Sequence, residues 1–526
     1  MNGAQALIRT LVDHGVDTCF MNPGTSEMHF VAALDDVTAM RSVLALFEGV
    51  ATGAADGYAR MTGRPAATLL HLGPGLGNGL ANLHNARRAY SPVLNIVGDH
   101  ATTHRRYDAQ LQSDIETVAR NVSSFVRSSQ STAELTVDAL AALAAATGPP
   151  GSVATLILPA DVSWSDGGVV VPGPPPGSTE PSLGSGGAAL DEEDLNAVAK
   201  ALRAGEPAVI LIGGRACSGH VLDTVADIAA ATGARLLAET FPARLERGAG
   251  RPSVERLAYL AEFTAMQLEG IRHLVLVDAR APVSFFAYPG KRSDLTPDGC
   301  VVYPLAGPAD DVASAVEALA SLLDVVTGTG PRQQVQTPAR PNGPLTAQSV
   351  CEALATLLPE GAIVSDEGNT SGVFAPGATA GAPPHDWLCL TGGAIGQGLP
   401  VAVGAAIASP DRRVVALEAD GSAMYTLQAW WTMAREGLDV TTILLNNHSY
   451  AVLNMELERV GVGSAGPRAK DMLDLGRPAI DFVHLATGLG LHAARAESAE
   501  EFTDELARAL ATPGPSMVEA ITPSLL

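Results

Sequence analysis

Residues 412–422, RRVVALEADGS, form a hydrophobic run that leads into a turn beginning at Asp420. A second run, TTILLNN at 441–447, ends in Asn447, and TLQAWWTMARE at 426–436 between them has the spacing of a helix. Hydrophobic runs joined by helices indicate neighbouring parallel strands that are covered on both faces. Ligands of such sheets bind beyond the carboxyl ends of the strands, so Asp420 and Asn447 are predicted at one ligand-binding edge.

Asp420 and Asn447 have the chemistry of a magnesium site. A carboxylate and an amide oxygen are hard oxygen ligands, which Mg²⁺ takes up together with phosphate oxygens. Gly421 and Ser422 then lead into a helix, whose free N–H groups and dipole favour a diphosphate. The alternative interpretation is a plain strand, turn and helix, in which Asp420 and Ser422 form an N-cap.

Asp-Gly-Ser followed after a spacer by Asn-Asn resembles the motif of thiamine-diphosphate-dependent enzymes, with Ala419 where that family usually has a first glycine. The resemblance implies that Asp420, Asn447 and the carbonyl group of Ser449 hold Mg²⁺. It also places further diphosphate contacts at the turn after Asp420 and in the segment SDEGNTSG at 365–372. The residues implied there are Gly421, Ser422, Asn369 and Thr370.

Two other segments resemble the pyrimidine side of the family's cofactor site. FEGVATGAADGYAR at 47–60 places Glu48 at the start of a helix of small residues, where the family carries its indispensable acid. By the resemblance, Glu48 hydrogen-bonds the aminopyrimidine ring and favours its imino tautomer. The alternative interpretation is that Glu48 only caps the helix. In TGGAIGQGLP at 391–400, Ile395 is implied as the wedge between the two cofactor rings, and the Gly393 carbonyl as acceptor from the pyrimidine amine.

Residues on the substrate side are similar to those of the decarboxylase branch of the family. FMNPGTSEMHF at 20–30 has Thr25 where benzoylformate decarboxylase has a serine, and His71 follows a predicted strand at the position of one of its two active-site histidines. We therefore expect Thr25 and His71 to be catalytic, whereas a structural histidine is the alternative for His71. The second histidine has no counterpart, because Phe285, Phe286 and Ala287 form an apolar wall in its neighbourhood.

The resemblance covers nearly the whole chain and is closest to acetolactate-synthase-like proteins, although residues 107–112, YDAQLQ, depart from that branch's Asp-Ala-Phe-Gln-Glu stretch. It implies thiamine-diphosphate-dependent decarboxylation of a 2-keto acid with carboligation. The alternatives are a simple 2-keto acid decarboxylase of the benzoylformate decarboxylase type and a catalytically silent regulatory paralogue. Because the family divides its site between subunits, a homodimer or homotetramer is implied.

The whole chain of 526 residues is too long for one hydrophobic core, and Pro- and Gly-rich segments divide it. We predict three doubly wound parallel-sheet α/β domains. By the resemblance these are a pyrimidine-binding domain at 1–166, a middle Rossmann-like domain at 190–326 and a diphosphate-binding domain at 345–526. The segments 167–187 and 327–344 are expected to be linkers that do not pack.

Two glycine-rich stretches were compared with the loops that bind nucleotides. Gly213 and Gly214 follow a strand of the middle block, a domain that binds FAD in some family members. Because a glycine pair alone lacks the spacing of a dinucleotide loop, we do not expect FAD here. GPGLGNG at 73–79 departs from the spacing of a dinucleotide loop. We interpret it as a turn of the cofactor domain, with an independent nucleotide site as the alternative.

The net charge and the cysteine spacing indicate which partners and which cellular compartment to expect. A formal net charge of -23 works against binding nucleic acid or an anionic membrane, so the expected partner is a small-molecule 2-keto acid. The five cysteines are scattered without CxxC spacing, which favours reduced thiols. With no long apolar run and no basic N-terminal leader, a cytoplasmic protein is expected.

Overall fold

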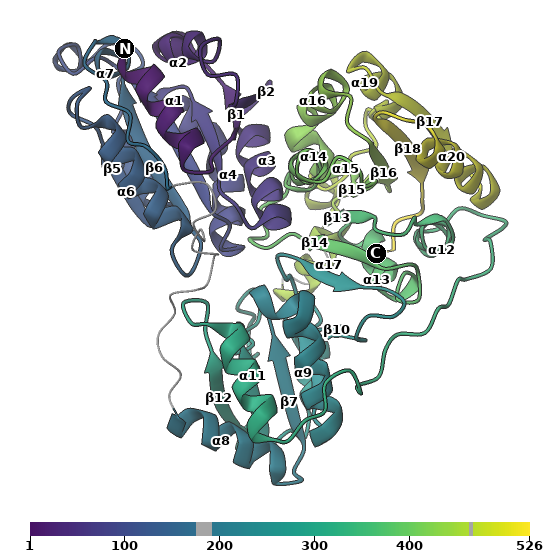
Figure 1. Ribbon diagram of the computed structural model, residues 1–526. Coiled ribbons are helices and arrows are strands. Elements are labelled where there is room, and N and C mark those ends of the chain that lie inside the picture. Colours follow the sequence, from purple (N-terminus) through teal and green to yellow (C-terminus); the bar gives the residue numbers. More distant parts are fainter. Residues whose placement is uncertain (175–191, 462–465, 526) are drawn as a thin grey trace.

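The computed structural model describes residues 1–174, 192–461 and 466–525 of the chain. Figure 1 shows three α/β domains: the first, in purple and blue, lies beside the third, in green and yellow, and the middle domain, in teal, lies below both. Each contains a sheet with helices packed against it. The predicted fold class, three doubly wound parallel-sheet domains, is confirmed.

The first domain contains a six-stranded sheet of order β2-β1-β3-β4-β6-β5, in which every pair is parallel. Its central strands are Val-, Leu- and Ala-rich runs buried along their whole length, as a sheet covered on both faces requires. The strands are β1 Thr18–Asn22, β2 Arg41–Leu44, β3 Ala66–Leu70, β4 Val93–Asp99, β5 Phe125–Ser128 and β6 Val153–Pro159. The helices are α1 Gly3–Asp13, η1 Thr25–Glu27, α2 Met28–Ala33, α3 Glu48–Thr62, α4 Leu72–Arg88, η2 Arg105–Tyr107, α5 Ile115–Arg120, α6 Leu135–Thr147 and α7 Ala160–Trp164.

The middle domain contains a five-stranded parallel sheet of order β10-β8-β7-β11-β12. The strands are β7 Ala208–Ile212, β8 Arg235–Ala238, β10 Glu255–Arg256, β11 His273–Val277 and β12 Val301–Ala306. The helices are α8 Glu192–Arg203, η3 Gly214–Cys217, α9 Gly219–Thr232, α10 Ala261–Gln267 and α11 Val312–Leu322.

The third domain contains a seven-stranded sheet of order β17-β18-β16-β15-β13-β14-β9. Its edge strand β9, Leu245–Arg247, comes from the middle block and runs antiparallel to β14, so this sheet is not wholly parallel. The other strands are β13 Ile363–Glu367, β14 His385–Cys389, β15 Val414–Ala419, β16 Val440–Asn446, β17 His492–Ala496 and β18 Ser516–Ile521. The helices are α12 Ala347–Leu357, η4 Ser371–Phe374, α13 Ala375–Ala378, α14 Gly398–Ala408, α15 Asp420–Thr426, α16 Gln428–Glu436, α17 Ala451–Arg459, α18 Pro467–Asp471, α19 Phe482–Gly488 and α20 Ala499–Ala511.

The predicted linkers pack against the domains where the structure describes them, which corrects the expectation that they would not. The Val171 N–H donates to the Thr10 hydroxyl of α1, at 3.1 Å. In the second segment, the N–H groups of Gly328 and Gly330 donate to the buried Asp227 carboxylate, at 2.6 and 2.7 Å. Backbone N–H groups in a Pro- and Gly-rich segment still need partners, and these carboxylate and hydroxyl groups supply them. Residues 175–187 of the first segment lie outside the described residues.

Helices α3 and α14 join the first domain to the third. Their small residues let the backbones approach closely: a Cβ added at Gly404 would lie 1.9 Å from the Ala54 carbonyl oxygen. The buried Arg60 of α3 pairs with Asp56 at 2.6 Å and donates to the Cys389 carbonyl at 2.8 Å, at the end of β14. The first and third domains therefore form a continuous packed unit within the chain.

Two remaining expectations concern the cysteines and the membrane. All five cysteines are free thiols, and Cys19, Cys217, Cys351 and Cys389 are buried. Burial raises the pKa of the Cys389 thiol to about 11, which keeps it protonated at neutral pH. Among the helices that the structure describes, none is long and apolar enough to cross a membrane.

Candidate active site

Asp420 and Asn447 lie at the carboxyl edge of the third sheet, as the sequence predicts. Strands β15 and β16 are parallel neighbours whose last paired residues are Ala419 and Leu445, and α15 and α16 lie between them in sequence. Asp420 is the first residue of α15, and one of its carboxylate oxygens, Oδ1, accepts from the Gly421 N–H at 2.8 Å. The other oxygen, Oδ2, is buried and has no hydrogen-bond partner among the described residues.

The Asp420 carboxyl group faces the turn after Asn447. Burial raises the pKa of Asp420, and the N–H groups of Gly421, His448 and Ser449 oppose that rise. The Asn447 side-chain oxygen accepts from the Ser449 N–H at 3.0 Å, which fixes the turn. A buried carboxylate oxygen without a partner, beside an amide oxygen and the backbone of a tight turn, fits the hard oxygen ligands of Mg²⁺.

The predicted diphosphate residues come together from two strand ends. Asn369 follows β13 in a left-handed conformation, with φ of 46°, and its amide donates to the Ser422 hydroxyl at 2.8 Å. Ser422 and Gly421 are in the first turn of α15, and Thr370 directly precedes η4. Asn369 and Ser422 are thus in contact at the edge that holds Asp420.

Gly393 and Ile395 lie on the loop between β14 and α14. Both residues are half-buried, and Gly393 has a φ of +73°, a conformation that favours glycine. The Phe285 ring of the middle domain packs directly on Gly393, because a Cβ added there would lie 2.6 Å from Cζ. The predicted apolar wall therefore lies against this loop, and Phe286 continues it, with ring centroids 5.1 Å apart.

Glu48 begins α3 in the first domain and is buried. Its Oε2 accepts from the Asn78 amide of α4 at 3.0 Å, a partner that no pattern in the sequence indicated. A Cβ added at Gly75 would lie 2.9 Å from Glu48 Oε1 and 3.5 Å from the His71 Cβ, so Glu48 and His71 flank the same point of α4. The glycine-rich stretch 73–79 is part of this helix and is not the turn that we expected.

His71 is held by Glu27, a second residue that was not among the predicted site residues. The Glu27 carboxylate lies 2.8 Å from His71 Nδ1 and also accepts from the Gly24 N–H at 2.8 Å. Glu27 is buried; burial raises its pKa, and the neighbouring His71 opposes that rise. Thr25 is exposed at the start of η1, in the same loop. The only signal in the sequence was the position of Glu27 within the quoted loop, 20–30.

The described contacts bring the predicted residues together in two groups. Glu48 and His71 lie in the first domain, and Asp420, Asn447, Ser422 and Asn369 lie in the third. The loop of Gly393 joins the two domains, since Asn82 and Asn85 of α4 donate to its Gly396 and Ala394 carbonyls, at 3.1 and 2.8 Å.

The glycine pair of the middle domain lies against acidic side chains. Gly213 and Gly214 follow β7, and a Cβ added at Gly214 would lie 2.4 Å from an oxygen of Asp278, a residue that follows β11. The Arg215 guanidinium pairs with Asp278 at 3.1 Å, and Glu239 lies beside Gly213. Burial raises the pKa of Glu239 to about 7. A carboxylate against the glycines and an arginine already paired are unfavourable for the diphosphate of a dinucleotide.

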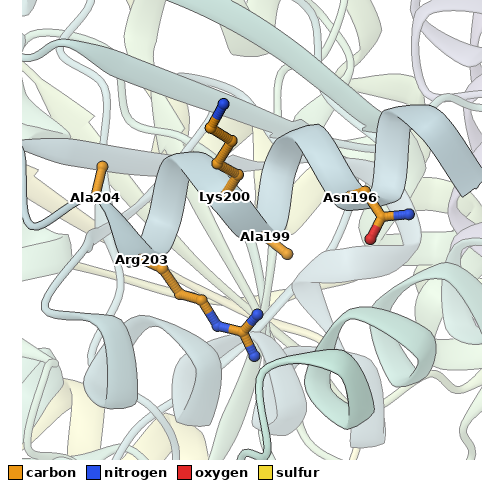
Figure 2. A pocket seen from close by; sticks show the side chains of 5 residues that line it. All are labelled: Asn196, Ala199, Lys200, Arg203 and Ala204. Carbon is orange, nitrogen blue, oxygen red and sulfur yellow. The ribbon is translucent and has the colours of Figure 1, made fainter.

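A separate hollow lies on α8 of the middle domain (Figure 2). In this view the side chains of Lys200 and Arg203 point away from each other. The lining residues are Asn196, Ala199, Lys200, Arg203 and Ala204. The hollow contains none of the predicted site residues.

Two family models match the chain, one in the first domain and one in the third. Residues 1–120 match the family model described as "Thiamine pyrophosphate enzyme, N-terminal TPP binding domain". Residues 366–520 match "Thiamine pyrophosphate enzyme, C-terminal TPP binding domain". These ranges contain Glu48 and His71 in the first domain and Asp420 and Asn447 in the third.

Similar proteins cover the whole chain. The chain is 59% identical to the Mycobacterium tuberculosis protein named "Putative acetolactate synthase large subunit IlvX", over 100% of both chains. It is 28% identical to benzoylformate decarboxylase of Pseudomonas aeruginosa, over 97% of both chains. The solved structure of a thiamine diphosphate-dependent 4-hydroxybenzoylformate decarboxylase from Rhodococcus jostii RHA1 has the same fold, with a TM-score of 0.85, 24% identity and 99% of both chains covered.

Proposed function

Because the chain belongs to the thiamine pyrophosphate enzyme family, we propose that it decarboxylates a 2-keto acid and joins the remaining acyl unit to a second carbonyl compound. The observation that carries this proposal is the buried, unpartnered Oδ2 of Asp420 beside Asn447, with Glu48 buried in the matching first domain. Relatives named for acetolactate synthase support the carboligation half of the proposal.

Each predicted site residue has a proposed role in binding the metal or the cofactor. Asp420, Asn447 and the Ser449 carbonyl would hold Mg²⁺, and Asn369, Thr370, Gly421 and Ser422 would contact the diphosphate. Bound thiamine diphosphate supplies the carbanion chemistry of decarboxylation. Glu48 would hold a proton at the pyrimidine ring nitrogen, with the Asn78 amide fixing its carboxyl group. The Gly393 carbonyl would accept from the pyrimidine amine, and Ile395 would keep the two rings at an angle.

A simple decarboxylase is the second candidate, and the contact between His71 and Glu27 favours it. A histidine whose Nδ1 lies 2.8 Å from a buried carboxylate has a fixed orientation, and its other nitrogen, Nε2, would be the group that donates a proton during turnover. Thr25, in the same loop, would contact the substrate. One relative, from Pseudomonas aeruginosa, and two solved structures with the same fold carry decarboxylase names.

The proposed assembly is a homodimer or homotetramer with Glu48 and Asp420 of one site coming from different subunits. The family resemblance supports this arrangement. We also propose that the middle domain binds no FAD, because Asp278 lies against Gly214 and pairs with Arg215. Freshly purified protein should then show no flavin absorbance.

Turnover with a panel of 2-keto acids tests the proposed function. The full-length protein, loaded with thiamine diphosphate and Mg²⁺, is incubated with pyruvate or benzoylformate while CO₂ and the organic products are measured. CO₂ with a hydroxyketone or acetolactate supports carboligation, whereas CO₂ with an aldehyde identifies a simple decarboxylase. Cofactor binding without turnover across the panel supports the regulatory paralogue. Failure to bind thiamine diphosphate in the presence of Mg²⁺ overturns the proposal.

A further inference from the structure

Glu367 is a buried acid that the proposed function does not use. It is the last residue of β13 and is 2% exposed. Its Oε1 accepts from the Gly396 N–H at 2.7 Å, and its Oε2 accepts from the Gly398 N–H at 2.5 Å. Both oxygens of one carboxylate are thus directed at the start of α14 and the loop before it. A carboxylate at this end of a helix is stabilised by the free N–H groups and the helix dipole.

The same loop is held from its other side by the first domain. Asn85 of α4 donates to the Ala394 carbonyl at 2.8 Å and accepts from the Ala394 N–H at 3.2 Å. Asn82 donates to the Gly396 carbonyl at 3.1 Å, and His84 Nε2 lies 3.2 Å from the Gly392 carbonyl. The carbonyls of residues 392, 394 and 396 are therefore occupied, and no described residue hydrogen-bonds the Gly393 carbonyl.

Keeping Glu367 at this place is energetically costly. Its register partner on β15 is Glu418, which is 1% exposed and has both carboxyl oxygens buried without a partner among the described residues. Burial raises the pKa of Glu367 to about 7, although the N–H groups of Gly398, Gly396 and Gln397 act to lower it. On β13 the residues beside Glu367 are the polar Ser365 and Asp366, whereas Leu417 beside Glu418 is apolar and fully buried. Two acids buried side by side cost free energy and contribute nothing that the pairing of β13 with β15 requires.

We propose that Glu367 is a positioning residue, whose carboxylate holds the Gly392–Gly398 loop in the shape that presents the Gly393 carbonyl and the Ile395 side chain to the cofactor's pyrimidine. The inference rests on the proposed function for the identity of the ligand. That Glu367 holds the loop is inferred from its two hydrogen bonds and does not depend on the identity of the ligand.

Amide hydrogen exchange of the full-length protein without cofactor tests the hold directly. Glu367→Gln keeps the shape but replaces one acceptor oxygen by an NH₂ group, which cannot accept from an N–H. The peptide covering Gly396 to Leu399 should therefore exchange about tenfold faster, the effect of one lost buried hydrogen bond. Glu367→Ala removes both acceptors, so the same peptide should exchange faster still in that variant.

Glu519→Gln is the matched control, because Glu519 is a fully buried glutamate of the same sheet that pairs with Asn446 and Arg495 away from the loop. It should lower stability but leave exchange of the loop unchanged. Equal loop exchange in wild type and a folded Glu367→Gln variant would overturn the inference. If Glu367→Ala does not fold, Glu367→Gln alone decides.

Titration with thiamine diphosphate, with and without MgCl₂, links the loop to the ligand. Glu367→Gln should bind about tenfold more weakly than wild type yet keep its dependence on Mg²⁺, since the metal ligands are intact. Unchanged affinity in the variant would overturn the positioning role even if exchange is faster. Wild-type protein that does not bind the cofactor would instead overturn the proposed function, while the exchange result would still decide whether Glu367 holds the loop.

Discussion

At the residue scale, Glu48 is a single carboxyl group buried at the start of α3, with Asn78 as its partner. Glu48→Gln keeps the size of the side chain and removes the proton exchange that the proposed role needs. We expect turnover to fall by about 10²- to 10⁴-fold, while the Kd for thiamine diphosphate changes little. The exposed Glu116→Gln, in the same domain, is the control for losing one acid. Full activity in Glu48→Gln would require another route for the proton.

Asp420 has a different task, which depends on its unpartnered Oδ2. Asp420→Ala should abolish the dependence of cofactor binding on Mg²⁺, because the proposed site loses its one carboxylate ligand. Binding measured by calorimetry at several Mg²⁺ concentrations checks this. Asp411→Ala, an exposed aspartate of the same domain, should behave as wild type. If cofactor binding by Asp420→Ala still depended on Mg²⁺, Asp420 would not be a ligand of the metal.

At the scale of elements, the contact of α3 with α14 depends on residues without side chains. A Cβ at Gly404 would lie 1.9 Å from a backbone oxygen, which cannot rotate away, so Gly404→Ala should force the helices apart. We expect a loss of about 1–3 kcal/mol in the free energy of unfolding, measured by denaturant titration. Gly77→Ala in α4, where no atom lies within 4 Å of the added Cβ, should be neutral or stabilising. Equal effects of the two substitutions would show that the close approach is unimportant.

At the scale of the whole molecule, a site shared between subunits predicts complementation. Glu48→Gln and Asp420→Ala are each expected to be inactive, but a mixed dimer would combine both lesions in one site and leave the other intact. Random mixing by co-expression should restore about a quarter of wild-type turnover. A mixture as inactive as its components would place Glu48 and Asp420 of each site in the same chain.

The stability of the folded chain should also depend on pH through His385, a 4% exposed residue at the start of β14. Burial, with the nearby Arg247 guanidinium, lowers its pKa from 6.5 to about 4. The unfolded chain therefore binds this proton first, and the stabilisation present above pH 6.5 is lost as pH falls toward 4. Wild type should lose about 3 kcal/mol relative to His385→Gln across that window, by denaturant titration at each pH. The exposed His492→Gln should follow wild type.

The local hydrophobic pattern was sufficient to predict the central strands of the sheets and the residues at which they end. Runs such as 414–419 and 440–446 are hydrophobic along their length, and this local pattern is sufficient to predict a buried parallel strand. Polar residues directly after such runs, Asp420 and Asn447 among them, then fall at the same sheet edge without knowledge of any contact. The resemblance to the thiamine-diphosphate family rested on those same residues.

The side chains that meet from distant parts of the chain could be identified only from the folded structure. Glu27 with His71, Asn78 with Glu48, and Glu367 with the loop before α14 are contacts between separate elements, and no local pattern encodes them. The pairing of β9 with the third sheet and the packing of residues 327–344 were missed for the same reason. Composition describes what a segment prefers on its own, whereas the partners of its backbone and side chains depend on how the domains pack together.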